Sequence, residues 1–279
     1  MKKKKYSRVY LEITNICNRN CSFCHGTKRE KKKLSMEEFS YIVKSLVGVT
    51  DYLYFHVMGE PLTHPLLPDF IEYASSLGFK CAITTNGTLL WDRREELLSS
   101  PVYKINISVH SFEEGSDENY LSYIKNIADF ASDAADRGIL TVLRLWNKGQ
   151  DNGRNDKTLD ILTARLQGEW KCGARGARIR HKLHLEYGDR FSWPDMSCEN
   201  MGSQVYCYGL GDHFGVLSDG RVIPCCLDSE GDVTLGNLFE SSIDSILNSE
   251  RAVAIRQGFD NKYAVEELCQ KCGYARRFR

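Results

Sequence analysis

Three cysteines near the start of the chain are the residues best suited to metal chemistry. Cys17, Cys21 and Cys24 form a C-x3-C-x2-C run that directly follows the apolar segment 9–13. Three thiolates on one short loop can hold three irons of a cubane cluster and leave the fourth iron without a protein ligand. A metal with an open position can activate a bound molecule, whereas a closed site is structural. The run therefore indicates a catalytic iron–sulfur cluster; the alternative is zinc, which usually binds paired C-x2-C units.

The spacing of this run, the aromatic Phe23 before its last cysteine and its place after a first strand resemble the radical SAM superfamily. The resemblance implies that the open iron of a [4Fe-4S] cluster binds S-adenosyl-L-methionine, and that one electron then splits it to a 5′-deoxyadenosyl radical. It also implies that a flavodoxin or ferredoxin supplies the electron, and that Phe23 lies beside the cofactor.

Further cofactor-binding candidates follow later strand-like segments. The run Met58-Gly59-Glu60-Pro61 resembles the G-G-E-P element of the family, which binds the methionine amino group largely through backbone, with Met58 in place of the first glycine. Asn86 stands in an Asn-Gly pair that is also an ordinary turn sequence. Ser108 resembles the ribose-contacting residue of the family. We predict that Gly59, Glu60, Asn86 and Ser108 contact the cofactor.

Arg144 is a candidate both for cofactor binding and for catalysis. It interrupts the apolar run 142–146, and a buried guanidinium needs an anionic partner. A carboxylate held in bidentate fashion is the natural one. Two partners are open: the carboxylate of S-adenosylmethionine or of the substrate, or an acidic side chain such as Glu60 in a structural ion pair.

Strand-like and helix-like segments alternate from Val9 onward, which predicts an α/β fold with a buried parallel sheet. Ser35 and Glu38 form a capping box at the start of the first helix. The family resemblance implies a partial (β/α)6 TIM-like barrel, with chemistry at the carboxyl ends of its strands. The predicted strands are 9–13, 52–57, 80–84, 104–109, 140–145 and 179–185. The predicted helices are 35–47, 67–77, 93–98, 119–137, 158–166 and 243–257.

A second group of cysteines lies in the last third of the chain. Cys207, Gly220 and Cys225 form a C-x12-G-x4-C pattern around a predicted Asp-Gly hairpin, and Cys269 and Cys272 form a C-x2-C pair. These spacings resemble a small SPASM/twitch domain, and the layout resembles radical SAM dehydrogenases with one auxiliary cluster. The resemblance implies a partial barrel over residues 1–190 and a domain over 191–279 whose four cysteines hold an auxiliary [4Fe-4S] cluster. A zinc ribbon is the alternative for these four ligands.

The remaining cysteines have other expected roles. Cys81 lies in a predicted strand and is expected in the core. Cys198 or Cys226 could replace one of the four auxiliary ligands, and Cys172 has no assigned role. Cys226 is also a catalytic candidate, because a free thiol beside the substrate can give a hydrogen atom to a substrate radical.

Composition excludes several classes of protein. The chain has 279 residues, is 42% hydrophobic and has a formal net charge of zero, which gives no argument for binding nucleic acid. No apolar run approaches a membrane span and no h-region follows the lysines at the start, so we expect neither a membrane helix nor a signal peptide. Eleven cysteines without an export signal favour metal ligation, and we expect a cytoplasmic protein.

We therefore predict a radical SAM oxidoreductase that removes a hydrogen atom from its substrate. An auxiliary cluster with no open iron favours electron transfer, and hence a two-electron oxidation. The substrate is expected to be a small metabolite, since only sixteen residues precede Cys17 and leave no room for a peptide-recognition domain. Two alternatives stay open: a maturase that crosslinks, epimerises or forms a thioether in a ribosomally made peptide, and a non-catalytic iron–sulfur or zinc scaffold.

Overall fold

The fold of this chain, taken from a computed structural model, is described for residues 5–113, 115–151 and 153–278. The described residues form one 11-stranded sheet with the order β11-β10-β9-β1-β2-β3-β4-β5-β8-β7-β6. Its middle is parallel from β9 to β8, and antiparallel strands extend it at both edges. The parallel strands are β1 (Arg8–Leu11), β2 (Tyr52–Phe55), β3 (Lys80–Thr85), β4 (Lys104–Ser108), β5 (Leu140–Lys148), β8 (Leu183–Asp189) and β9 (His213–Val216).

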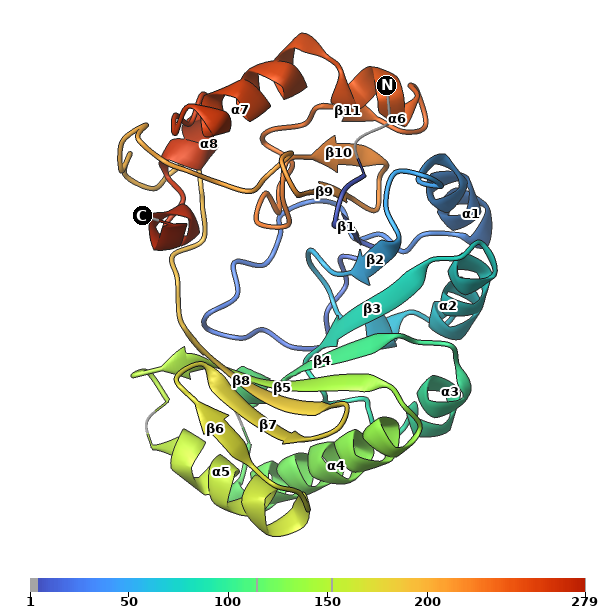
Figure 1. Ribbon diagram of the computed structural model, residues 1–279, viewed down its shortest axis with the longest axis vertical. Helices are drawn as coiled ribbons and strands as arrows, with labels where there is room; N and C mark the ends of the chain where they lie inside the picture. Colours follow the sequence, from blue (N-terminus) through green and yellow to red (C-terminus); the bar gives the residue numbers. More distant parts are fainter. Residues whose placement is uncertain (1–4, 114, 152, 279) are drawn as a thin grey trace.

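Helices after the first five strands cover the outer side of the curved sheet, as Figure 1 shows. Ser35 caps the first of them as predicted: its hydroxyl accepts from the Glu38 N–H, and the Glu38 carboxylate accepts from the Ser35 N–H. Apolar faces of the first two helices meet through Phe39 and Phe70, whose rings stack 4.0 Å apart. These helices are α1 (Met36–Ser45), α2 (Leu67–Ser76), α3 (Arg94–Ser99), α4 (Asp117–Asp136) and α5 (Arg154–Arg165), with single 3-10 turns η1 (Pro61–Thr63) and η2 (Val109–Ser111).

The sixth predicted strand, 179–185, is wrong as a single strand. The chain reverses at Lys182, which has a φ of +63°, so the segment is divided between two antiparallel strands. A meander therefore follows α5, and only its last strand, β8, joins the parallel part of the sheet. The two added strands are β6 (Lys171–Gly173) and β7 (Gly176–Arg180).

The C-terminal third packs against the first strand. Strand β9 pairs in parallel with β1, and the predicted Asp-Gly hairpin leads from it into the antiparallel strand β10. Gly220 has a φ of +85°, the left-handed conformation that such a turn requires. The remaining elements are β10 (Arg221–Ile223), β11 (Gly236–Asn237), α6 (Ile243–Leu247), α7 (Glu250–Asp260), α8 (Glu267–Gln270) and the 3-10 helix η3 (Tyr274–Phe278).

The helix predicted over 243–257 is also wrong as a single helix. It is broken at Asn248 and Ser249, because the hydroxyl of Ser249 accepts from the Ala252 N–H and caps a new helix, α7. Ser and Asn favour such caps over helix interiors. Among the described residues, no helix is long and apolar enough to cross a membrane.

Candidate radical SAM site

The cysteine loop, residues 15–33, leaves the carboxyl end of the first strand and is closed at its base by hydrogen bonds. The Leu34 N–H donates to the Ile13 carbonyl at 2.9 Å, and the Thr14 hydroxyl donates to the Lys32 carbonyl at 2.9 Å. The Lys32 N–H donates to the Asn15 side-chain oxygen at 2.8 Å. The three cysteines therefore lie on a loop whose two ends are fixed to each other.

The three thiols are close enough to influence one another. The Cys24 N–H donates to the Cys21 carbonyl at 3.1 Å, and the Arg19 N–H donates to the Cys17 sulfur at 3.4 Å. Partial burial, then Glu113 and the neighbouring thiols, raises the pKa of Cys21 to about 11. Partial burial also raises the pKa of Cys17. Cysteine binds metal as the thiolate, and these raised pKa values disfavour the thiolate form. The irons of a cluster would bring the positive charge that stabilises the thiolates.

Gly59 lets the loop after β2 approach the cysteine loop. It has a φ of +80°, and a Cβ at this position would lie 2.3 Å from the Thr14 carbonyl oxygen. The next residue, Glu60, donates its N–H to the Ile16 carbonyl at 2.9 Å. Only glycine fits such a close contact between two backbones in this conformation. The predicted cofactor contact of Gly59 remains a prediction, but its location next to Cys17 is suitable.

The side chain of Glu60 is hydrogen-bonded to the protein backbone. Its carboxylate accepts from the Leu62 N–H at 3.0 Å and from the Asn86 N–H at 2.6 Å. The residue is 2% exposed, and this burial raises the pKa of Glu60 to about 7. The side chain thus ties the loop after β2 to the loop after β3. The Glu60 backbone is also engaged, because its carbonyl accepts from the Thr63 N–H at 3.0 Å, and its predicted cofactor contact remains a prediction.

Asn86 connects the same loop to the first cysteine. Its side-chain nitrogen donates to the Asn18 side-chain oxygen at 2.9 Å and lies 3.9 Å from the Cys17 sulfur. Its side-chain oxygen accepts from the Thr88 N–H at 2.9 Å. The Tyr123 hydroxyl, from α4, donates to the Asn86 carbonyl at 2.6 Å. The Asn-Gly pair is therefore more than a turn, because it is fixed against the cysteine loop from both sides.

Arg144 lies opposite Ser108 on the neighbouring strand, and both line a large cavity. Its Nε is 3.3 Å from the Glu186 carboxylate, and its guanidinium lies over the Trp146 ring at 4.6 Å from the centroid. The proposed ion pair with Glu60 is wrong, because the Glu60 carboxylate is bonded to the backbone of Leu62 and Asn86. The acidic partner is Glu186, on β8.

The four predicted auxiliary ligands meet at one wall of this cavity. Gly209 lies next to two of them: a Cβ there would be at ordinary contact distance, 3.7 Å, from both the Cys207 sulfur and the Cys225 Cβ. Burial raises the pKa of Cys225 well above its usual value, and the nearby Cys207, Cys269 and Cys272 add to the effect. Cys272 is buried and the other three are half-buried, and thiols that raise one another's pKa in this way fit a cluster that brings positive charge. No three His, Cys, Asp or Glu side chains of the described ranges are grouped closely enough to hold a single metal ion.

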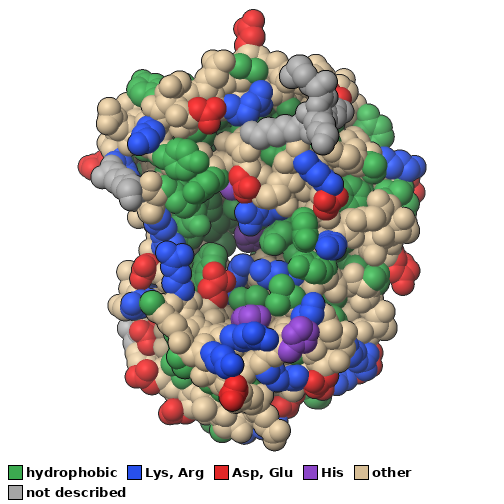
Figure 2. Space-filling model, in the orientation of Figure 1, with side chains coloured by type: hydrophobic (Ala, Val, Ile, Leu, Met, Phe, Trp, Pro, Cys, Tyr) green, Lys and Arg blue, Asp and Glu red, His purple; other side chains and the backbone are tan. Residues whose placement is uncertain are grey.

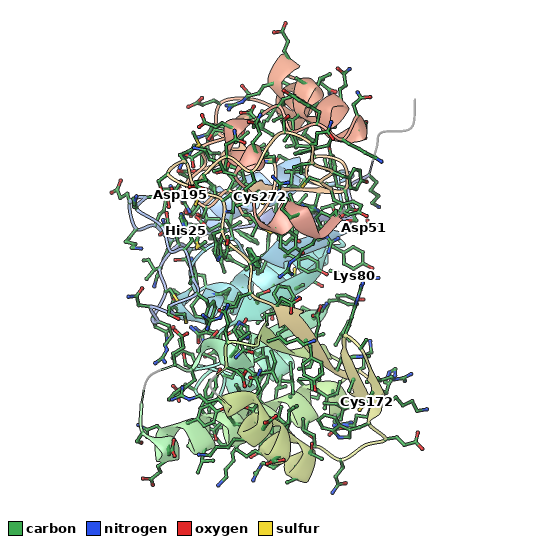
Figure 3. All side chains as sticks on the ribbon, turned by 90° about the vertical axis from the view of Figure 1, so that its left-hand side faces the viewer. His25, Asp51, Lys80, Cys172, Asp195 and Cys272 are labelled. Carbon is green, nitrogen blue, oxygen red and sulfur yellow. The ribbon has the colours of Figure 1, made fainter. Side chains whose placement is uncertain are left out.

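Three of the remaining cysteines lie in different parts of the molecule. Cys226 lines the cavity and shares a side-chain hydrogen bond with Tyr10. Cys81 is fully buried in β3, as expected of a core residue. Cys172 is exposed on the edge strand β6, and Figure 3 shows it at the other end of the molecule from Cys272.

A segment that sequence reasoning did not single out holds the cysteine loop from the other side. The Trp193 indole N–H donates to the Phe23 carbonyl at 3.1 Å, and Asp195 lies 3.2 Å from the His25 ring. Figure 3 shows His25 and Asp195 side by side. The Arg190 guanidinium lies 5.2 Å from the Phe23 ring centroid. Phe23 is therefore enclosed between this segment and the barrel, where it lines the cavity.

Glu12 is a second residue that was missed. It is 1% exposed at the end of β1, and its carboxylate pairs with the Arg29 guanidinium of the cysteine loop at 2.6 Å. It also accepts from the Ser218 hydroxyl at 2.8 Å and from the Met58 N–H at 3.3 Å. An acid inside the apolar run 9–13 was the available signal, since a buried carboxylate needs partners.

The cavity has a volume of about 710 Å³ and extends from Phe23 of the cysteine loop to the four cysteines of the C-terminal part. Its wall includes Phe23 from the cysteine loop, Ser108 and Arg144 from the barrel, and Cys207 and Cys225 from the C-terminal part. Figure 2 shows a hollow between the two halves of the molecule, with Lys, Arg and His side chains around it. A molecule bound here would touch both parts of the chain.

Residues 11–151 match the family model of the radical SAM superfamily, and residues 207–273 match that of the SPASM iron-sulfur cluster-binding domain. The chain is 24% identical to a probable GTP 3′,8-cyclase of Methanocella arvoryzae, covering 96% of this chain and 95% of that protein. It is also 24% identical to the subtilosin biosynthesis protein AlbA of Bacillus subtilis, covering 95% of this chain and 64% of that protein. The crystal structure of BtrN with AdoMet and 2-DOIA superposes with a TM-score of 0.62 at 18% identity, covering 97% of this chain and 94% of BtrN.

Proposed function

The chain belongs to the radical SAM superfamily, and from this premise we propose that it oxidises a small polar molecule by two electrons. When bound, S-adenosylmethionine and the cluster at Cys17, Cys21 and Cys24 supply a 5′-deoxyadenosyl radical, and the auxiliary cluster supplies an electron acceptor. The substrate would give up one hydrogen atom from a C–H bond, then one electron and one proton.

One observation carries this proposal: a single cavity is lined both by Phe23 and by the four auxiliary cysteines. Phe23 directly precedes Cys24, so this end of the cavity lies beside the first cysteine group. A substrate in the cavity would therefore lie between the place where its hydrogen is removed and the place where its electron leaves.

The chain's own residues would position the substrate and take the proton. His110 and Glu186 line the cavity, and both can accept a proton. Burial lowers the pKa of His110 to about 4, so its imidazole is neutral at pH 7 but a weak base, and Glu186 is the second acceptor. The contact of Trp193 with Phe23 closes the side of the cavity next to the cysteine loop, which limits access of water to a radical.

The space in the cavity supports a small substrate. The volume of about 710 Å³ lies in the range of small-molecule pockets, about 300–1,000 Å³, and part of it would be taken by S-adenosylmethionine and the auxiliary cluster, whose predicted ligands line it. A peptide substrate would need an extended groove. Peptide maturation is therefore the alternative that the experiment below distinguishes from oxidation of a small molecule.

The test compares the wild-type holoenzyme with a variant in which Cys207, Cys225, Cys269 and Cys272 are alanine. Both are incubated anaerobically with S-adenosylmethionine, a reductant, and either the small-molecule or the peptide fraction of an extract from the producing cells. We expect the small-molecule fraction to stimulate 5′-deoxyadenosine formation by the wild type and to yield a product lighter by two hydrogens.

The cysteine variant should still release 5′-deoxyadenosine slowly but form no such product. Circular dichroism and retained iron at the first site establish that the variant is folded. Equal product formation by the variant contradicts the two-electron proposal. Stimulation by the peptide fraction alone assigns the chain to peptide maturation instead.

A further inference from the structure

The end of the cavity farthest from the cysteine loop contains a group of cations that the proposed chemistry does not use. Arg8 and Lys104 are the first residues of β1 and β4. Arg144, on β5, lies in register with Ser108, but its charge is near enough to Lys104 to add to the effect of burial in lowering the pKa of that ammonium. All three line the cavity. Parallel strands begin at one edge of a sheet and end at the other, and the cysteine loop follows the end of β1. Figure 3 shows the start of β3, marked by Lys80, and His25 of the cysteine loop on opposite sides of the molecule.

The charges at this end do not balance. Arg8 pairs with Asp212 at 2.9 Å, and Arg144 pairs with Glu186 at 3.3 Å. Lys104 makes no ion pair with any residue of the described ranges. The nearby His56 adds no anion, because burial holds its pKa at about 4 and the ring is neutral. Lys104 is half-buried, and the acid that acts on it, Glu186, already pairs with Arg144, so three cations share two carboxylates.

These cations carry more hydrogen-bond donors than the two carboxylates accept. Asp212 accepts from Arg8 at 2.9 Å and Glu186 accepts from Arg144 at 3.3 Å, while the Lys104 ammonium makes no hydrogen bond within the described part of the chain. Donors that line a cavity without a protein partner favour an acceptor on a bound molecule. The acceptor that satisfies both the donors and the surplus positive charge is an oxygen anion.

We propose that this end of the cavity binds an anionic oxygen group of the substrate, a phosphate or a carboxylate, held by Lys104 together with Arg8 and Arg144. The guanidinium fork of Arg144 matches the oxygens of either group, and the Lys104 ammonium adds a point charge. The inference rests on the proposed function, because it places the substrate in this cavity.

The location of the anion also limits the orientation of the substrate. Lys104 and Ser108 are the two ends of β4, roughly 13 Å apart at about 3.3 Å per residue. Phe23 and the radical chemistry belong to the Ser108 end. Arg144 is in register with Ser108 and Lys104 with Leu140, so an anionic group held by both would lie between the two ends of β4, with the reacting C–H bond of the substrate toward the Ser108 end.

The experiment measures binding of inorganic pyrophosphate and of succinate to the anaerobic holoenzyme by titration calorimetry. We expect the wild type to bind at least one probe, and the one that binds identifies the phosphate or carboxylate class. Lys104→Met should weaken binding by about tenfold or more, whereas Lys104→Arg should keep it within about threefold. Lys80→Met is the matched control, because Lys80 begins the neighbouring strand but stacks on the Tyr52 and Tyr103 rings.

Absence of binding by either probe, or an equal loss in Lys80→Met, overturns the inference. If Lys104→Met fails to fold, amine acylation of the wild type followed by mass spectrometry replaces it: the bound probe should protect Lys104 and not Lys80, and equal protection overturns the inference. Uncoupled release of 5′-deoxyadenosine by the wild type needs no substrate anion. That readout therefore separates a failure of the proposed function from a failure of the anion site.

Discussion

The carboxylate of Glu60 and the backbone N–H of Asn86 form a hydrogen bond of 2.6 Å across 26 residues of sequence. It joins the loops that follow β2 and β3, and Asn86 in turn reaches the Cys17 sulfur. Parallel strands bring these two loops to the same edge of the sheet, but they do not fix the distance between the loops. The buried Glu60 carboxylate fixes that distance, because it accepts from one backbone N–H in each loop.

This carboxyl group should make stability depend on pH. The pKa of Glu60 is raised to about 7 in the folded protein, above its ordinary value of 4.5, so the folded state holds the proton more tightly. Its contribution to stability is full below about pH 4.5 and is lost as the pH rises toward 7. We expect Glu60→Gln to remove this slope, on the order of 2–3 kcal/mol between pH 5 and 7.5. Anaerobic urea unfolding of both proteins at these pH values measures it, and parallel slopes would contradict the assignment.

Replacing Gly59 by alanine should damage the site through the backbone alone. The change adds a left-handed penalty of about 1–2 kcal/mol and a Cβ 2.3 Å from the Thr14 oxygen. We expect a loss of about 3 kcal/mol in unfolding free energy and weaker binding of S-adenosylmethionine. Gly48 is the matched control, since it has the same φ of +80° and nothing within 4 Å of its Cβ position.

The control variant Gly48→Ala should lose only about 1–2 kcal/mol and keep cofactor cleavage. Unfolding curves and 5′-deoxyadenosine release are compared for the two alanine variants. Equal losses in both would mean that the close approach to Thr14 has no effect of its own.

The pair of Arg29 and Glu12 should be among the costliest to break. Both side chains are nearly inaccessible, 9% and 0% exposed, so Arg29→Met leaves a buried carboxylate without its cation. We expect a loss of about 3–5 kcal/mol, and partial recovery in the double variant with Glu12→Gln. The control is the more exposed pair of Lys32, on the same loop, and Glu38 of α1, whose side chains are 34% and 31% exposed.

Breaking this control pair with Lys32→Met should cost about 0–1 kcal/mol. Denaturant unfolding of the four proteins completes the comparison. A small loss in Arg29→Met, or no recovery in the double variant, would show that the pair does not hold the cysteine loop.

The two cysteine groups should bind iron independently. Anaerobic reconstitution of the wild type should give about eight irons, as two cubanes. Alanine at Cys17, Cys21 and Cys24 should remove about four irons and all 5′-deoxyadenosine formation. Cys172→Ser, at an exposed edge position, should leave both unchanged. Iron and sulfide analysis with Mössbauer spectra checks the counts, and about four irons with stoichiometric zinc in the wild type would refute the auxiliary cluster.

Local patterns in the sequence were sufficient where the interacting residues are close along the chain. The capping box of Ser35 and the hairpin at Gly220 were predicted in this way, and the spacing of Cys17, Cys21 and Cys24 indicated the family. The sixth strand and the last long helix failed for a related reason. Hydrophobicity alone does not reveal a reversal at Lys182 or a new cap at Ser249, because each depends on a single backbone conformation.

The sequence by itself determined the family, the α/β alternation and the two cysteine groups. Each of these can be recognised from the spacing of residues that lie close together along the chain. The tertiary structure decided which distant residues meet. Ser218 reaches Glu12 across 206 residues, Trp193 reaches Phe23 across 170, and β9 lies beside β1. It also decided that Glu186 is the partner of Arg144 and that Lys104 has none in the described part of the chain. Such contacts depend on strand order and side-chain burial, which no local spacing encodes.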